Sequence, residues 1–152
     1  MDNLIKQLRD KNLILTTAES CTGGMLSAAI TEISGASDIF DRGFITYSNA
    51  AKIKMLGVSE KLIHTYGAVS EQCAAAMAQG ALENSNANIA ISITGIAGPN
   101  SDETQKPVGL VYIGLILKGE KQQVTEHNFK GTRKEIRHKT CDAAMELLLS
   151  AI

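Results

Sequence analysis

The chain has 152 residues, with 15 Lys and Arg against 16 Asp and Glu, which gives a net charge of -1. At this length we expect one domain over residues 1–152 that buries about 70% of the unfolded chain's surface. The balanced charge and an aromatic content of 4% without Trp argue against nucleic acid or an anionic membrane as a partner.

The first part of the chain alternates between helical and extended patterns. We expect an amphipathic helix at residues 2–11, a buried strand at 13–19 and a second helix at 23–33. A strand rich in β-formers follows at 39–47, where Gly43 indicates a local weakness or bulge. This opening is typical of an α/β unit.

The alternation continues to the end of the chain. Small residues fill an expected helix at 70–85, which therefore can lie flat on a sheet. The other expected elements are helices at 48–57, 59–66 and 132–150, and strands at 89–93, 108–118 and 122–129, the last at a sheet edge. We predict the α/β class, with three layers in an α/β/α sandwich.

Cysteine usage and the N-terminus indicate a cytoplasmic protein. Cys21, Cys73 and Cys141 are odd in number and far apart, which argues against a disulfide framework and a zinc site. Neither the apolar core of a signal peptide nor a stretch of ~20 apolar residues is present. Stripes of Met and Ala fit either a core or a homo-oligomer interface, and the sequence leaves both open.

The stretch from Thr17 to Gly24 concentrates polar groups where a strand turns into a helix. Ser20 and Thr22 provide hydroxyls, and Gly23 and Gly24 allow a ligand to approach the backbone. Free amides at a helix start favour a phosphate, a carboxylate or a developing oxyanion. The alternative is that one of the hydroxyls only caps the helix.

Two further loops have the composition of binding loops. Residues 94–107 follow a buried strand and contain Gly95 and Gly98 without any periodicity, which suits a ligand loop or a plain surface connector. In the second, Gly131 precedes a helix start, and Arg133 could offer a planar fork to a phosphate. Taken alone, an arginine such as Arg133 is more often a solvated surface charge than a phosphate ligand.

A serine and a lysine lie close together in the sequence around the strand at 39–47. A serine needs a base to attack at neutral pH, and Lys52 can be that base if burial lowers its pKa. Ser37 and Tyr47 lie near it in the chain, although each of these residues is ordinary in isolation. The three histidines follow no ligand spacing, so we expect neither a metal nor a cofactor.

Six motifs, in this order along nearly the whole chain, resemble the CinA C-terminal domain family. They are TAESCTGG at 17–24, FDRGFITYSN at 40–49, GAVS at 67–70, SITGIAGP at 92–99, KPVGLVY at 106–112 and FKGTR at 129–133. The resemblance implies a mixed sheet and nicotinamide-nucleotide amidohydrolase activity. Such an enzyme converts nicotinamide mononucleotide to nicotinic acid mononucleotide and ammonia in pyridine-nucleotide salvage, and no metal or cofactor is implied.

The resemblance also implies roles for individual residues. It points to Ser37 as the nucleophile and Lys52 as its general base, with Tyr47 and Ser20 orienting the amide or relaying protons. The local pattern instead favours Ser20 as the nucleophile, so both serines stay open. The binding roles fall to Thr22, Gly23, Gly24, Gly95, Gly98, Gly131 and Arg133, of which Arg133 and the helix start after Gly131 would hold the phosphate.

Two departures from the family pattern leave alternatives. A glutamate often found two residues before the lysine is replaced by Ala50, and residues 100–103 replace a glycine-rich continuation. A catalytically silent nucleotide-binding or competence-associated interaction protein is therefore one alternative. A different substrate that shares a carboxamide and a phosphate is another.

Overall fold

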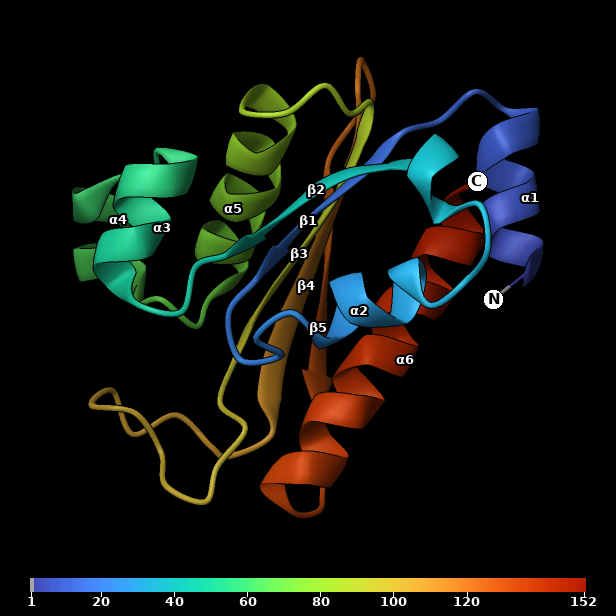
Figure 1. Ribbon diagram of the computed structural model, residues 1–152. Coiled ribbons are helices and arrows are strands. Elements are labelled where there is room, and N and C mark those ends of the chain that lie inside the picture. The colour runs from blue at the N-terminus through green and yellow to red at the C-terminus, as the bar shows by residue number, and fades with distance from the viewer. Residues whose placement is uncertain (1) are drawn as a thin grey trace.

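The computed structural model describes residues 2–152 as a five-stranded mixed sheet between two layers of helices (Figure 1). The strands are β1 (Leu15–Glu19), β2 (Phe40–Ile45), β3 (Ile89–Gly95), β4 (Leu110–Leu117) and β5 (Gln123–Asn128). Their order is β2-β1-β3-β4-β5. β1 is parallel to β2 and β3, and the β3-β4 and β4-β5 pairs are antiparallel. The predicted sandwich, its mixed sheet and the edge position of β5 are confirmed.

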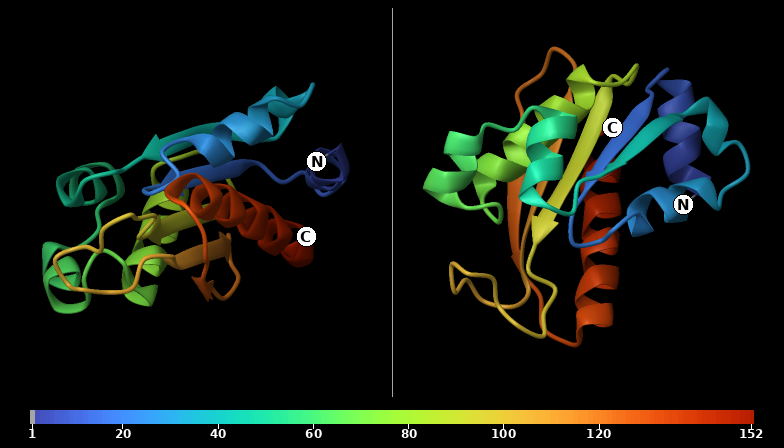
Figure 2. Two further views of the ribbon diagram at one scale, coloured as in Figure 1. Left: turned by 90° about the horizontal axis from the view of Figure 1, so that it is seen from below. Right: turned by 60° about the vertical axis from the view of Figure 1, so that its left-hand side comes forward.

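Helices cover both faces of the sheet, as the two further views also show (Figure 2). One layer holds α1 (Asp2–Asp10), α2 (Met25–Thr31) and α6 (Arg133–Ala151). The other holds α3 (Asn49–Leu56), α4 (Glu60–Tyr66) and α5 (Glu71–Glu83). Each expected helix is present with slightly different ends, and a short 3-10 helix, η1 (Ala36–Asp38), lies between the expected helix at 23–33 and the expected strand at 39–47. None of the helices in residues 2–152 is long and apolar enough to cross a membrane.

The two faces of β3 differ, and this difference sets the spacing of the layers. Ile89, Ile91 and Ile93 belong to the core cluster shared with α1, α2 and α6. The opposite face carries Ala90 and Ser92, and the Ser92 hydroxyl donates to the α5 backbone at 2.6 Å. Small side chains on that face let α5 lie close to the sheet, as its composition predicted.

The irregularity expected at Gly43 lies elsewhere. Gly43 pairs regularly with Thr17, whereas the register of β2 against β1 shifts at Asp41, between Phe40 and Arg42. A Cβ on Gly43 would lie 2.6 Å from the Ser27 Oγ, so the glycine serves a close approach of α2 rather than a bulge.

Candidate active site

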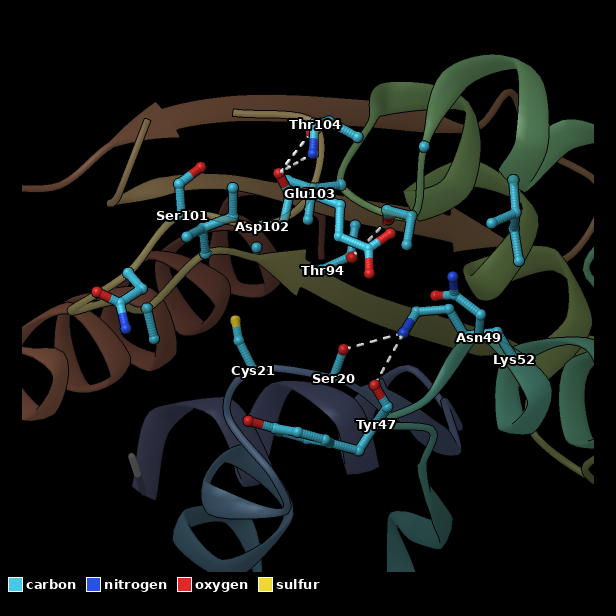
Figure 3. A pocket seen from close by; sticks show the side chains of 18 of the residues that line it. Ser20, Cys21, Tyr47, Asn49, Lys52, Thr94, Ser101, Asp102, Glu103 and Thr104 are labelled. Carbon is cyan, nitrogen blue, oxygen red and sulfur yellow. Dashed lines mark hydrogen bonds between the residues drawn. The ribbon is translucent and has the colours of Figure 1, made fainter. Parts of the chain in front are cut away.

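A cavity of about 690 Å³ opens beyond the carboxyl ends of β1 and β3 (Figure 3). Its walls come from the loops that follow β1, β2 and β3, from α3 and α4, and from the first residue of α6. Carboxyl ends of neighbouring parallel strands are where open α/β sheets place their ligands. The residues discussed below that line it are Ser20, Cys21, Tyr47, Asn49, Lys52, Gly95, Gly98, Glu103 and Arg133.

Lys52 is the largest fully buried side chain near this cavity, with 1% of its surface exposed. The sequence places it in the first turn of α3, where the Ser48 hydroxyl caps the helix by accepting from the Ala51 amide at 3.0 Å. Its Nζ lies 3.0 Å from the Ser20 Oγ and 2.9 Å from the Thr46 carbonyl oxygen. The Tyr47 carbonyl oxygen is 3.4 Å away.

The environment of Lys52 disfavours its charged form. Burial lowers the pKa of this amine below its ordinary value of 10.5, and only the thiols of Cys73 and Cys21 act in the opposite direction. The two side-chain ion pairs found in residues 2–152 are both elsewhere. Lys52 is thus a buried amine that faces a hydroxyl and two carbonyl oxygens, which suits a neutral amine acting as a base.

Ser20 follows directly on β1 and is 8% exposed. Its amide donates to the Ile93 carbonyl at 3.0 Å, which ties the end of β1 to β3. Figure 3 shows the Ser20 hydroxyl and the Cys21 thiol side by side on the cavity wall, with Lys52 opposite Ser20. Burial raises the pKa of the Cys21 thiol to about 11, so this thiol is protonated near neutral pH.

The start of α2 does not face the cavity as the sequence led us to expect. The carboxylate of Glu19 accepts from the Gly24, Leu26 and Ser27 amides at 3.0, 3.1 and 2.8 Å. These donors are therefore occupied from within the protein. Thr22, Gly23 and Gly24 all lie outside the cavity lining, so the structure does not bring these three predicted binding residues to the site.

Tyr47 and Arg133 meet at the cavity although 86 residues separate them. The Arg133 guanidinium donates to the Tyr47 hydroxyl at 2.9 Å and to the Gly98 carbonyl at 2.6 Å. Gly95 and Gly98 line the cavity as expected, whereas Gly131 does not. Gly131 instead has a φ of +132° and makes room for Glu135 in the capping of α6.

The structure separates Ser37 from Lys52. Ser37 is exposed on η1, which precedes β2, whereas Lys52 lies on the helix after β2. The six residues of β2 span ~20 Å between these two ends. Closeness in the sequence was a misleading guide because β2 carries the chain from one end of the strands to the opposite end. Lys52 therefore pairs with Ser20, and the predicted pairing with Ser37 is corrected.

Sequence reasoning missed several residues that the structure brings together. Thr46 contributes a carbonyl oxygen, Glu19 organises the Ser20 loop, and Asn49 and Glu103 line the cavity. The signal for Glu19 was present, since an acidic residue followed by a glycine-rich helix start is a capping pattern. Among residues 2–152, no three His, Cys, Asp or Glu side chains are grouped as a metal ion would require.

Comparison with known proteins places this chain in a family. A family model described as CinA C-terminal domain matches residues 1–152. The nicotinamide-nucleotide amidohydrolase PncC of Enterobacter agglomerans is 48% identical over 86% of this chain and 79% of its own length. A CinA-like protein of Syntrophobacter fumaroxidans is 49% identical over 94% of this chain.

This chain spans about a third of the length of the CinA-like relatives, 34% in the Syntrophobacter protein. The solved structure of the competence/damage inducible protein CihA from Agrobacterium tumefaciens is 44% identical, with a TM-score of 0.94. That alignment covers 98% of this chain and 91% of the CihA chain. The matched length, the shared fold and the order of the motifs agree, and the chain belongs to the CinA C-terminal domain family.

Proposed function

We propose that this domain hydrolyses the carboxamide of nicotinamide mononucleotide to nicotinic acid mononucleotide and ammonia. The observation that carries the proposal is the contact of 3.0 Å between Lys52 Nζ and Ser20 Oγ inside the cavity. A 48% identical relative is named as a nicotinamide-nucleotide amidohydrolase. Every residue in the proposed machinery comes from this one domain, and three buried free thiols suit a reducing cytoplasm.

The geometry around Lys52 favours its action as the base. A neutral amine has two N–H donors and one lone pair. The carbonyl oxygens of Thr46 and Tyr47, at 2.9 and 3.4 Å, can accept from the two donors. The lone pair is then left for the proton of the Ser20 hydroxyl, which is the arrangement that a serine nucleophile needs.

The reaction would proceed in two steps. Ser20 Oγ attacks the carboxamide carbon while its proton passes to Lys52 Nζ, and the tetrahedral oxyanion collapses to an acyl-enzyme. The departing nitrogen takes the proton from Lys52 and leaves as ammonia. Lys52 then removes a proton from water, which attacks the ester and releases the carboxylic acid and the Ser20 hydroxyl.

Backbone amides next to Ser20 are suited to hold the oxyanion. Among residues 2–152, the Cys21 amide donates to no backbone carbonyl, whereas Gly24, Leu26 and Ser27 donate to Glu19. A donor on the residue after the nucleophile is a recurrent arrangement in serine hydrolases. We therefore propose that the Cys21 amide supplies one of these donors.

Arg133 is proposed to bind the phosphate of the nucleotide. It is the only arginine that lines the cavity, and two of its nitrogens are held by Tyr47 and Gly98. A guanidinium fixed in this way can present its remaining N–H donors to a phosphate. Nicotinamide mononucleotide should stabilise the protein against heat more than its nucleoside or free nicotinamide does. Equal stabilisation by all three would contradict a phosphate-dependent site.

The deciding experiment measures ammonia release from nicotinamide mononucleotide by the wild type and three variants. Ser20→Ala and Lys52→Ala are expected to lose about 10³-fold or more in kcat. Ser37→Ala is the matched control, and its activity should equal that of the wild type. Loss of activity in Ser37→Ala alone would move the nucleophile back to Ser37.

A folded wild type without turnover would contradict the proposal. If nicotinamide mononucleotide still stabilised that protein, the catalytically silent nucleotide-binding alternative would replace it. Turnover of another phosphorylated carboxamide would keep the Ser20–Lys52 chemistry and change the substrate.

A further inference from the structure

The buried carboxylate of Glu19 forms no ion pair with any of residues 2–152. Glu19 is 1% exposed and lies directly before Ser20. It takes part in neither of the two ion pairs in residues 2–152. Four donors satisfy it instead, namely the amides of Gly24 and Leu26 on Oε2 and the amide and hydroxyl of Ser27 on Oε1. A buried charge is costly unless hydrogen bonds compensate it.

These hydrogen bonds close the turn that carries Ser20. Glu19 belongs to β1, and its donors belong to the start of α2, so the carboxylate joins the two ends of the Ser20 turn. The Ser27 Oγ also contacts the Thr17 Oγ1 at 2.7 Å, which extends the network back along β1. The turn can thus shift relative to the strand only if several of these bonds break together.

A second clamp holds the same turn from α6. The Arg137 Nε donates to the Cys21 carbonyl at 3.0 Å, and its Nη2 donates to the Thr22 carbonyl at 2.8 Å. The turn is therefore fixed on one side by the Glu19 carboxylate, which accepts from backbone amides. On the other side it is fixed by the Arg137 guanidinium, which donates to backbone carbonyls. Side chains held on both sides are what a catalytic group needs in order to keep its geometry.

We infer that Glu19 is a positioning residue, which fixes the turn so that Ser20 Oγ lies within hydrogen-bond distance of Lys52 Nζ. The inference rests on the proposed function, because it assigns a role in activating the same serine. The carboxylate takes the place that an external anion would have at the start of α2. It acts through geometry, since the causes that shift the pKa of Lys52 are burial and two thiols.

The test measures the reactivity of Ser20 itself, with a fluorophosphonate as the probe. Ser20 Oγ attacks phosphorus, fluoride leaves, and the hydroxyl proton passes to Lys52. Mass spectrometry of the Ser20 peptide then gives the labelling rate without reference to any substrate. Circular dichroism at the assay temperature gives the folded fraction, so that rates can be stated per folded molecule.

Glu19→Gln keeps the shape of the side chain but turns one acceptor into a donor that faces an amide donor. We expect the labelling rate per folded molecule to fall by about tenfold to a hundredfold, as for a displaced catalytic group. The pH midpoint of labelling, which is governed by Lys52, should stay where it is. Glu135→Gln is the matched control, because Glu135 also accepts a backbone amide at a helix start. It should leave the labelling rate unchanged.

Ser27→Ala is the alternative test variant if Glu19→Gln does not fold. It removes one of the four donors and keeps the carboxylate, and it should slow labelling by about twofold to fivefold. An unchanged labelling rate per folded molecule, in whichever variant folds, would overturn the inference and reduce Glu19 to a stabilising role. A shifted pH midpoint would also overturn it, because Glu19 would then act on the charge of Lys52.

The same assay separates this inference from the proposed function. A wild type that labels Ser20 but releases no ammonia from nicotinamide mononucleotide would contradict the substrate and leave the role of Glu19 standing. A wild type that never labels Ser20 would overturn both.

Discussion

Lys52 combines a stability cost with a chemical benefit in one side chain. Lys52 is 1% exposed and forms no ion pair with a carboxylate among residues 2–152, and burial lowers the pKa of its amine. In the proposed mechanism the same burial favours the neutral amine, whose lone pair would accept the proton of the Ser20 hydroxyl at 3.0 Å. Sites that tune a base in this way commonly give up stability for function.

Replacing the amine should therefore separate activity from stability. Lys52→Met keeps the length and the packing of the side chain, removes the base, and is expected to lower kcat by about 10³-fold. Since no buried amine remains to be desolvated, the melting temperature at pH 7 should be equal to or above that of the wild type. A clearly lower melting temperature in thermal unfolding would mean that the hydrogen bonds of Lys52 outweigh its burial.

The lowered pKa of Lys52 also predicts how the protein responds to pH. Activity should rise with pH as the amine loses its proton. Between the lowered pKa and 10.5, the unfolded chain holds a proton on Lys52 that the folded protein does not. The free energy of unfolding should therefore rise with pH across this window. Urea unfolding at a series of pH values would test this, and the rise should be smaller in Lys52→Met.

The sequence predicted a site residue well only where neighbouring residues in the chain mark its position. Ser20 was found because its neighbours show a strand turning into a helix. The Lys52–Ser20 contact joins residues 32 positions apart, and the contact between Arg133 and Tyr47 joins residues even further apart. No local pattern carries that information, which explains why Ser37 seemed the better partner from chain proximity.

At the scale of elements, the position of α3 depends on its close contact with α5. A Cβ added to Gly80 of α5 would lie 1.9 Å from the Leu56 carbonyl oxygen, at the end of α3. α3 also carries Lys52 in its first turn. The glycine thus lets α3, which carries the proposed base, rest against α5.

Gly80→Ala should disturb both stability and activity. The added methyl forces the two helices apart, which is expected to cost about 1 to 3 kcal/mol. The same displacement should lower kcat because it moves Lys52 relative to Ser20. Urea unfolding and ammonia release would measure the two effects.

Gly119→Ala provides the comparison for this variant. Gly119 has a φ of +86° and open space around its missing Cβ, so only the backbone strain of about 1 kcal/mol is expected, without loss of activity. Equal effects of the two variants would show that α3 and α5 have room to adjust.

Elements were predictable where one periodic pattern determined them. The continuous apolar run at residues 89–93 indicated a buried strand, and both faces of β3 are indeed covered. The shift at Asp41 was not predictable, because it depends on the register against β1. The Asp41 carboxylate there accepts from the Asn86 amide at 2.9 Å, a contact across 45 residues.

At the scale of the whole molecule, each layer of the sandwich protects a thiol. Burial raises the pKa of Cys73 to about 11 and that of Cys141 to about 12, and Cys21 resembles them. At pH 8 we expect the native protein to react with Ellman's reagent far more slowly than the protein in urea, where all three thiols should react. The absorbance of the released thiolate gives both rates. Rapid reaction of Cys73 or Cys141 in the native state would show that its helix layer opens readily, whereas Cys21 can also be reached through the cavity.

The open side of β2 has a consequence for behaviour at high concentration. In residues 2–152, β2 pairs only with β1, so its outer edge presents free backbone groups. An edge of this kind can recruit strands from other molecules and nucleate aggregates. Asp41 interrupts the register, Arg42 adds a second charge, and Gly43 weakens the strand. The edge beside the proposed active site is thus built to keep neighbouring molecules from joining the sheet.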